Sequence, residues 1–287
     1  MSFLFSFRRG KGLGLMLAVL AGAWSCSSPD PAPANESEHL TLGNPSGATA
    51  DVKMPSNYLL LKPQFALSYH RSQGKPNWVS WHLTTRWLGS AARQDNFRPD
   101  SQLPPTWYRV TSASYAGSGF DRGHNCPSAD RTSTAADNSA TFLMTNMMPQ
   151  APRNNQRTWA GLEEFCRRQL QNGANELYVV CGSYGRGGTG SEGYKTTLDQ
   201  GHVTVPARVW KVVVILPEGD DDDAARVTAS TRVIAIDIPN DNNLTDSWED
   251  YRTSVDAIEA ATGYDLLSAV APAVQQQLER RIDQGPI

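Results

Sequence analysis

The chain has 287 residues, of which 39% are hydrophobic and 19% are charged. It carries 26 basic and 29 acidic side chains, a formal net charge of −3. This composition excludes a wholly disordered or collagen-like chain, and the length suits one large domain or two small ones. The slight acidic excess argues against a protein that binds nucleic acid mainly through a net positive charge.

The first 25 residues are typical of a signal peptide. A basic stretch that ends at Lys11 is followed by eleven apolar or glycine residues at 13–23, too few to span a bilayer comfortably. Small residues at the −3 and −1 positions then precede Cys26, which resembles a bacterial lipobox. We therefore expect export, with Cys26 either carrying a lipid anchor or left as a free thiol after plain cleavage. The product would be periplasmic, a cell-envelope lipoprotein or secreted.

Residues 26–55 are rich in Pro, Ser, Ala, Asn and Gly and have no apolar periodicity, which predicts a flexible tether. The folded domain is expected to span 56–287 as one unit, because the sequence contains neither an internal repeat nor a second linker. Removing residues 1–25 leaves 23 basic and 29 acidic side chains, so the mature chain has a net charge of −6. We expect contact with a membrane only through an N-terminal lipid.

The fold class predicted for this domain is α+β, with a largely antiparallel central sheet flanked by helices. Two strand-like runs at 65–70 and 77–84 surround a Gly-Lys-Pro turn and predict a hairpin. The stretch at 89–119 is irregular. Later in the chain, the patterns predict a helix at 156–171, strands at 177–181, 208–216 and 232–238, and a last helix at 247–262 that ends at Gly263.

Three cysteines lie in the predicted domain, and an odd number leaves at least one thiol without a disulfide partner within it. Cys166 lies on the predicted helix and Cys181 on the next strand, so these two are one candidate pair if the geometry allows. A zinc site at His124 and Cys126 is a weak alternative, because His-x-Cys alone lacks paired ligand spacing.

Residues 119–168 contain most of the chemically informative side chains. The tetrad Asp-Arg-Gly-His at 121–124 places a histidine beside a glycine, where the backbone can approach a ligand closely. Downstream, four side chains recur every four residues: Asn155, Trp159, Glu163 and Arg167. Each such step advances about 40° around an α-helix, so the last three share one ridge, with the asparagine at or before its N-terminal end.

These residue types together could hydrolyse a phosphodiester. A neutral histidine accepts a proton from water, an asparagine oxygen suits Mg²⁺ that keeps most of its water, and arginine binds phosphate through two donors. Each also has a plainer interpretation in isolation: Glu163 and Arg167 as an i,i+4 helix pair, Trp159 as a core residue, and His124 as a loop or core histidine. The plainer interpretations leave the order and spacing of the residues unexplained.

Taken together, the motifs resemble the DNA/RNA non-specific endonuclease family, the sugar-non-specific nucleases with a ββα-metal finger active site. The tetrad at 121–124 matches the family's Asp-Arg-Gly-His hallmark, and 145–150 matches its Thr-Asn-x-x-Pro-Gln strand. The spacing at 155–167 matches its Asn-Trp-Glu-Arg helix, and 92–97 looks like the segment that holds its other catalytic arginine. The resemblance spans about residues 58–270.

The resemblance implies a role for each matched residue. His124 would be the general base, Asn155 the direct protein ligand of Mg²⁺, with Mn²⁺ as a substitute, and Arg93 the group that stabilises negative charge on phosphorus. Glu163 would hold water molecules of the hydration shell, and Arg167 would assist at the phosphate. Three further matched residues would support the site or contact substrate: Asp121, Arg122 and Asn146.

The resemblance implies a hydrolase that cuts DNA and RNA, single- or double-stranded, and leaves 5′-phosphate ends, with a protein inhibitor as a further partner. Little sequence preference is expected, because contacts to the nucleic-acid backbone carry no sequence information. Two alternatives stay open: a catalytically silent surface lipoprotein that binds nucleic acid or a partner, and an enzyme for another phosphodiester. The intact His124, Asn155 and Arg93 argue against the silent protein, because a binding protein needs no base.

The local charge of the central segment corrects the inference from net charge. Residues 86–168 contain ten Arg, no Lys and seven acidic residues, a local charge of +3, whereas the rest of the mature chain carries −9. A local arginine cluster can bind a phosphate through two donors while the global charge disfavours general adhesion to polyanions. That combination suits an enzyme that cuts and releases its substrate.

Overall fold

The computed structural model describes residues 1–4, 37–219 and 222–287, and the described residues from 37 onward form one compact unit. Most of the predicted signal peptide, Cys26 and the tether at 26–36 lie outside the described residues. Within the described ranges, no helix is long and apolar enough to cross a membrane.

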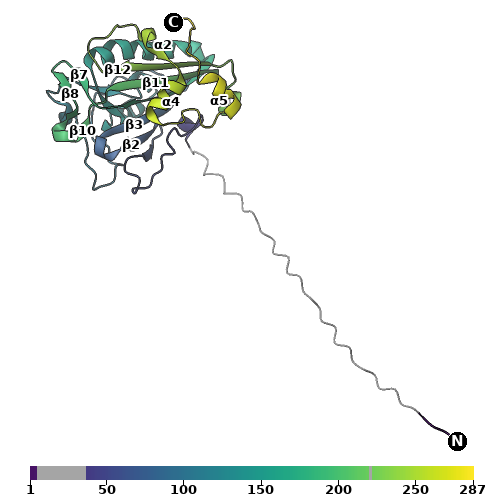
Figure 1. Ribbon diagram of the computed structural model, residues 1–287. Helices are drawn as coiled ribbons and strands as arrows, with labels where there is room; N and C mark the ends of the chain where they lie inside the picture. Colours follow the sequence, from purple (N-terminus) through teal and green to yellow (C-terminus); the bar gives the residue numbers. More distant parts are fainter. Residues whose placement is uncertain (5–36, 220–221) are drawn as a thin grey trace. The chain divides into compact units, whose positions relative to one another are not determined.

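A seven-stranded antiparallel sheet forms the centre of the domain (Figure 1). Its strand order is β1-β2-β3-β6-β11-β12-β13. The bounds are β1 Tyr58–Leu61, β2 Ala66–His70, β3 Lys75–Leu83, β6 Asn175–Tyr184, β11 Arg208–Pro217, β12 Arg232–Pro239 and β13 Arg252–Thr253. The predicted α+β class with a largely antiparallel sheet is confirmed, as are the first hairpin and the three later strands.

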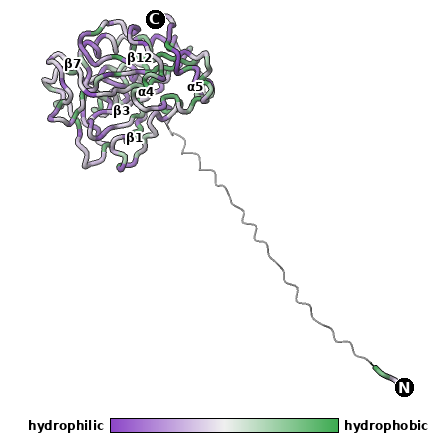
Figure 2. The backbone as a smooth tube through the Cα atoms, in the orientation of Figure 1, coloured by the Kyte–Doolittle hydropathy of each residue, from purple (hydrophilic) through white to green (hydrophobic). Residues whose placement is uncertain are grey.

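The sheet is buried on both faces. Along β11, Val209 and Val213 face one hydrophobic core, whereas Trp210, Val212 and Val214 face the other. This alternation follows from the two-residue period of a strand and explains why the sequence is an almost continuous apolar run here. Hydrophobic segments accordingly concentrate around β12 and α4 in Figure 2.

Helices cover the two faces separately. On one face, α2 (Ala160–Gln169) contributes Leu162 and Phe165 to the first core. On the other, α4 (Val255–Thr262) and α5 (Pro272–Leu278) contribute Val255, Ile258 and Leu278 to the second core and lie on the near side of the sheet in Figure 1. Each fully buried side chain of this kind stabilises the fold by about 1.5–3 kcal/mol relative to exposure.

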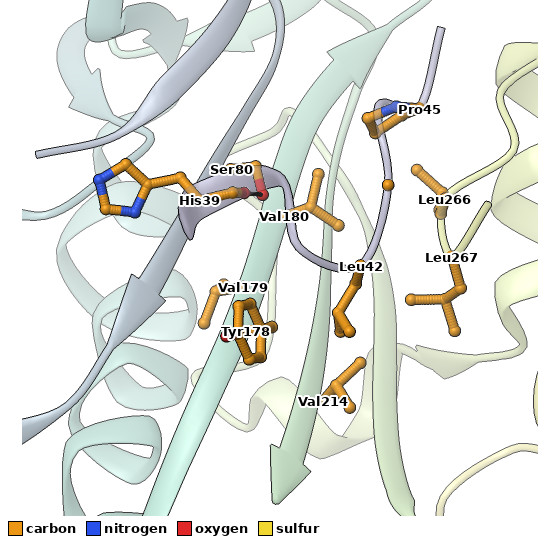
Figure 3. A pocket seen from close by; sticks show the side chains of 11 residues that line it. His39, Leu42, Pro45, Ser80, Tyr178, Val179, Val180, Val214, Leu266 and Leu267 are labelled. Carbon is orange, nitrogen blue, oxygen red and sulfur yellow. Dashed lines mark hydrogen bonds between the residues drawn. The ribbon is translucent and has the colours of Figure 1, made fainter. Parts of the chain in front are cut away.

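The folded domain begins before the predicted boundary at residue 56. Leu40, Leu42 and Ala48 are buried in the second core, and Ser80 of β3 donates a 2.7 Å hydrogen bond to the carbonyl of His39. Figure 3 shows this segment crossing the sheet, with Leu42 directed toward its strands. The predicted tether is therefore wrong for residues 37–55, because a few apolar anchors hold a segment whose overall composition is typical of a linker.

The last predicted helix is also too long. Residues Trp248–Tyr251 form a 3₁₀-helix, and α4 begins only after Ser254, whose hydroxyl accepts a hydrogen bond from the backbone of Ala257. Gly263, at φ 75°, ends α4 in the left-handed conformation that the sequence pattern predicts.

Apart from 3₁₀-helical turns, the remaining described elements are short and lie mostly in the long connections. They are α1 Ala135–Ala140, α3 Asp223–Arg226, β4 Asp121–His124, β5 Met147–Gln150, β7 Gly188–Gly190, β8 Gly193–Lys195, β9 Thr197–Leu198 and β10 Val203–Thr204. Residues 89–119 are irregular, as predicted, apart from a 3₁₀-helix at Ser112–Tyr115 and an isolated bridge at Arg98.

All three cysteines of the domain are free and buried in the first core. The candidate disulfide between Cys166 and Cys181 is therefore wrong; burial instead raises the pKa of the Cys166 thiol to about 12. The zinc alternative gains no support either, because neither group of metal-ligating side chains in the described ranges contains His124 or Cys126.

Candidate active site

Two short strands and a helical segment build the centre of the site. β4 (Asp121–His124) pairs antiparallel with β5 (Met147–Gln150), and His124 lies opposite Met147. A Cβ atom on Gly123 would lie 2.2 Å from Oε1 of Gln150, so only glycine fits between the strands at this point. The chain then enters the helical segment from residue 154 to 169, which completes a ββα arrangement.

The helical segment begins with a π-helical turn at Asn154–Trp159 rather than as a regular α-helix. A π-turn is wider than an α-turn, so each residue advances by less than the 100° of an α-helix. The 40° steps expected of a regular α-helix therefore do not apply between Asn155 and Trp159. Single π-turns inside helices are frequent at functional sites.

A cleft with a volume of about 480 Å³ opens beside this helical turn. Four of the predicted site residues line it, although they come from three separate segments of the chain: Arg93, Asp121, Arg122 and Asn155. The other lining residues are Asp95, Phe97, Ser112, Tyr115, Ala116 and Phe120. The fold thus brings together residues that lie up to 62 positions apart.

Asp121 holds Asn155 in place. The side-chain amide nitrogen of Asn155 donates a 2.8 Å hydrogen bond to Oδ2 of Asp121, and Gln156 donates a second one of 2.8 Å to the same oxygen. Because the nitrogen of Asn155 is engaged, its amide oxygen is left as an acceptor in the open cleft. One neutral oxygen, a nearby carboxylate and room for water fit a hydrated Mg²⁺ ion.

His124 lies behind the wall of the cleft, where it is 9% exposed. Its ring meets the rings of Phe97 and Phe142 edge-on, at centroid distances of 5.7 and 4.9 Å. Burial, with Arg93 and Arg122 nearby, lowers the pKa of His124 to about 3. The imidazole is therefore neutral at pH 7, and its Nε2 atom has no hydrogen-bond partner among the described residues.

The two cleft arginines are held differently. Arg93 donates through Nε to Asp95 at 2.7 Å and through Nη1 to Ser128 at 2.8 Å, and 52% of its side chain stays exposed. Arg122 lies over the ring of Phe97, 4.0 Å from its centroid, and takes part in none of the salt bridges between described residues. Both guanidinium groups therefore keep donors for an anionic ligand.

Asn146 has a structural role at the end of a 3₁₀-helix, Met144–Asn146, directly before β5. It is fully buried; its amide nitrogen donates to the carbonyls of Cys126 and Thr141, and its oxygen accepts from the backbone of Cys126. These bonds fix the loop that follows His124. Its burial leaves no surface for contact with substrate, so of its two expected roles only support fits.

Glu163 and Arg167 do not line the cleft. Oε1 of Glu163 lies 3.6 Å from Nζ of Lys211, and Arg167 donates a 2.9 Å hydrogen bond to Asp130. The i,i+4 pair that their spacing favours is not among the salt bridges of the described residues. Burial raises the pKa of the Glu163 carboxyl, although Lys211 opposes the shift.

Lys211 and Asp130 are two residues that the sequence analysis missed. Lys211 lies in the middle of β11 and is 1% exposed; its ammonium is 4.0 Å from the centroid of the Trp159 ring and too far from Glu163 for a hydrogen bond. Asp130 is 2% exposed and also accepts a 3.0 Å hydrogen bond from Trp81. A single lysine inside an apolar strand was the available signal, since a buried lysine nearly always has a partner.

The antiparallel strand pair, the following helix and the cleft that contains an asparagine and two arginines define a ββα-metal nuclease. The chain belongs to the DNA/RNA non-specific endonuclease family, whose model matches residues 46–273. It is therefore a hydrolase of a nuclease family, as the sequence motifs predict.

Several known nucleases are similar to this chain. A nuclease from Nostoc sp. is 53% identical over 247 residues, which cover 86% of each chain. Nuclease C1 from Cunninghamella echinulata is 35% identical over 195 residues, covering 65% of this chain and 73% of that protein. Among solved structures, the EndoG/EndoGI complex matches with a TM-score of 0.65 over 84% of this chain and 93% of that chain; at 23% identity it supports the fold alone.

Proposed function

We propose that this nuclease is exported, depends on Mg²⁺, and hydrolyses phosphodiester bonds of DNA and RNA with little sequence preference, leaving 5′-phosphate ends. The observation that carries the proposal is the cleft in which Asn155, bound to Asp121, lies with two arginines beside a neutral His124. Phosphodiester hydrolysis needs a base, a cation and groups that hold the phosphate, and these residues supply or bind each of them.

His124 is the proposed general base. A histidine must be neutral to accept a proton from water, and burial keeps this one neutral far below pH 7. The rings of Phe97 and Phe142 restrict the orientation of the imidazole, while Nε2 makes no hydrogen bond to another described residue. A positioned base of this kind contributes about 10²–10⁴ to the rate.

Asn155 is the proposed direct ligand of the ion. When bound, Mg²⁺ would neutralise charge on the scissile phosphate and on the departing 3′ oxygen. The hydrogen bond from the amide nitrogen to Asp121 fixes which end of the amide faces the cleft. Mn²⁺ prefers similar oxygen ligands, so we propose it as a substitute.

The arginines are the proposed phosphate-binding groups. Arg93 would stabilise the charge that builds on phosphorus, because Asp95 and Ser128 orient its guanidinium at the cleft without covering it. Arg122, on β4, would contact the substrate backbone from its own position in the cleft lining. Contacts of this type are made to phosphate oxygens, which is why we propose little sequence preference and the use of both DNA and RNA, single- or double-stranded.

Glu163 and Arg167 are proposed to act from behind the cleft. Their side chains are 15% and 23% exposed, so each keeps an edge accessible to solvent. Glu163 would hold water near the ion, and Arg167, oriented by Asp130, would assist at the phosphate.

Export is proposed from the N-terminal sequence, with Cys26 as the site of a lipid anchor and a periplasmic, cell-envelope or secreted location.

A protein inhibitor is a further proposed partner. The structurally similar EndoG was solved as a complex with EndoGI in a study of its inhibition. An exposed cleft lined by arginines would suit an acidic inhibitor.

The experiment that tests the proposed activity uses the mature chain with plasmid DNA and with RNA, in the presence of Mg²⁺ or EDTA. We expect metal-dependent degradation of both substrates, and product ends that a 5′-phosphate-specific exonuclease accepts. Absence of cleavage with either substrate would contradict the proposal and favour a silent binding protein. Cleavage of small phosphodiesters alone would favour the more restricted enzyme.

A further inference from the structure

Three carboxylates meet where α4 packs against the end of α5. Asp256 and Glu259 lie one turn apart on α4, and Glu279 directly follows the last residue of α5. Their ligand oxygens all lie within 4.8 Å of one another. A 3.0 Å backbone hydrogen bond from Asp256 to the carbonyl of Glu279 joins the two segments, which are neighbours in Figure 1.

This group of carboxylates has no positive partner. In the described ranges, no salt bridge contains Asp256, Glu259 or Glu279. Glu279 is 6% exposed, and its Oε1 atom is buried without a hydrogen-bond partner. Burial, together with the neighbouring acidic groups, raises the pKa of Glu279 to about 7. A buried, unpaired carboxylate is costly, so a cation or a proton is needed at this position.

A second cluster of metal-ligating residues provides a comparison within the same protein. This cluster consists of His82, Glu176 and Asp223. Arg226 forms salt bridges with both carboxylates, and Nε2 of His82 lies 2.8 Å from Oε2 of Glu176, within hydrogen-bond distance. That cluster carries its own counter-charge and has its polar atoms paired. The carboxylates at α4 and α5 have no counter-charge. Glu259 accepts a 2.8 Å hydrogen bond from the backbone of Leu266, but Oε1 of Glu279 has no partner among the described residues, which distinguishes an ion site from an internal ion-pair network.

We propose that Asp256, Glu259 and Glu279 bind a divalent cation of the calcium type. Calcium takes oxygen ligands at about 2.3–2.6 Å, so ligands on opposite sides of the ion are about 4.6–5.2 Å apart. The three carboxylates lie close enough together for one such ion to contact all of them. Calcium also accepts an irregular set of protein oxygens, whereas Mg²⁺ demands near-octahedral geometry and is rarely held by a cage made of protein ligands alone. The three carboxylates run from exposed Asp256 to buried Glu279, so water can complete the coordination from the open side.

The ion would stabilise the helices that cover the second core. Both α4 and α5 contribute buried residues to it, and the carboxylates otherwise repel one another across their junction. None of the three residues lines the catalytic cleft. The site therefore predicts calcium-dependent stability without a requirement for calcium in catalysis.

The test is a CaCl₂ titration of the EDTA-treated mature chain, followed by calorimetry and thermal unfolding at pH 7.5. Sites of this type on extracellular proteins bind calcium with Kd of about 10⁻⁴–10⁻³ M, so the titration covers about 0.05–10 mM. We expect one binding event and a rise in Tm of about 3–8 °C at saturation. Glu279→Gln should abolish both effects, yet raise the Tm in EDTA because it removes the unpaired charge.

Two controls separate this site from other sources of calcium binding. Asn155→Ala removes the proposed catalytic ligand, and Glu164→Gln removes an equal charge from an exposed position on α2. Both variants should keep the calcium-induced rise in Tm. A chain that shows no binding event, or a Glu279→Gln variant with an undiminished rise, would overturn the proposal. The result does not depend on nuclease activity, which Glu279→Gln should retain with Mg²⁺.

Discussion

The 2.8 Å hydrogen bond from the side chain of Asn155 to Asp121 joins the helical part of the site to its first strand. Asp121 begins the first strand of the ββα arrangement, and Asn155 lies on the π-helical turn that begins its helix. The bond therefore fixes the orientation of the proposed metal ligand and links the strand to the helical turn. A partner that orients a ligand in this way commonly changes metal affinity by about 10–100-fold when it is removed.

The first prediction concerns that bond. Asp121→Ala should raise the Mg²⁺ concentration for half-maximal activity by about 10–100-fold, because Asn155 loses the acceptor that orients its amide. Asp121→Asn should have a smaller effect, since its amide oxygen can still accept. Metal titrations of plasmid cleavage measure both, with exposed Asp51→Ala as a control. Equal Mg²⁺ midpoints in wild type and Asp121→Ala would remove Asp121 from this role.

The second prediction concerns the proposed base. His124→Ala should lower kcat by about 10²–10⁴ with little change in KM, because proton acceptance is lost while the phosphate-binding arginines stay in place. Steady-state kinetics on a defined oligonucleotide would measure both constants. His70→Ala, which changes a half-buried histidine outside the cleft, should leave them unchanged. Residual activity near the wild-type level in His124→Ala would assign the base to another residue.

The third prediction concerns Lys211. If Lys211 acts by positioning Glu163 across their 3.6 Å ion pair, Lys211→Met should lower kcat about tenfold in the wild type and by less than twofold in a Glu163→Gln background. Lys75→Met is the matched control, because Lys75 is also 1% exposed but its ammonium donates to the carbonyl of Pro76 in its own strand and not to a carboxylate of the site. A purely structural role for Lys211 would instead give independent losses in the two backgrounds, together with lower Tm values.

The fourth prediction concerns acid stability. Burial, with Arg131 nearby, lowers the pKa of His39 from 6.5 to about 3. Between these values the unfolded chain binds more protons than the folded one, so His39 makes the free energy of unfolding decrease as the pH falls from about 6.5 to 3. His39→Gln should remove this part of the pH dependence, which lowers the free energy of unfolding at pH 4.5 by on the order of 3 kcal/mol relative to pH 7.

Urea unfolding between pH 4 and 8 would measure the fourth prediction. The difference in unfolding free energy between wild type and His39→Gln should change across this range and level off above pH 7. His202→Gln alters an exposed histidine and should run parallel to the wild type. A pH-independent difference between wild type and His39→Gln would mean that folding does not lower the pKa of His39.

Local sequence patterns were sufficient to predict much of the fold and the family. The apolar run at 208–216 predicts a strand, and the tetrad at 121–124 with Asn155 identifies the family, because strand periodicity and motif spacing are properties of neighbouring residues. The ordinary composition of residues 37–55 gave no such signal. Their attachment depends on Leu40, Leu42 and Ala48 reaching a core formed by distant strands.

The sequence by itself determined the family and the fold class and predicted the candidate site residues, because these inferences follow from side-chain type and spacing. Only the tertiary structure decided the partners: Asp121 for Asn155, and Lys211 rather than Arg167 for Glu163. It also left the cysteines free and brought together three acidic residues without a counter-ion. Such contacts join residues 20–50 positions apart, and they depend on strand register and helix packing, which no local pattern specifies.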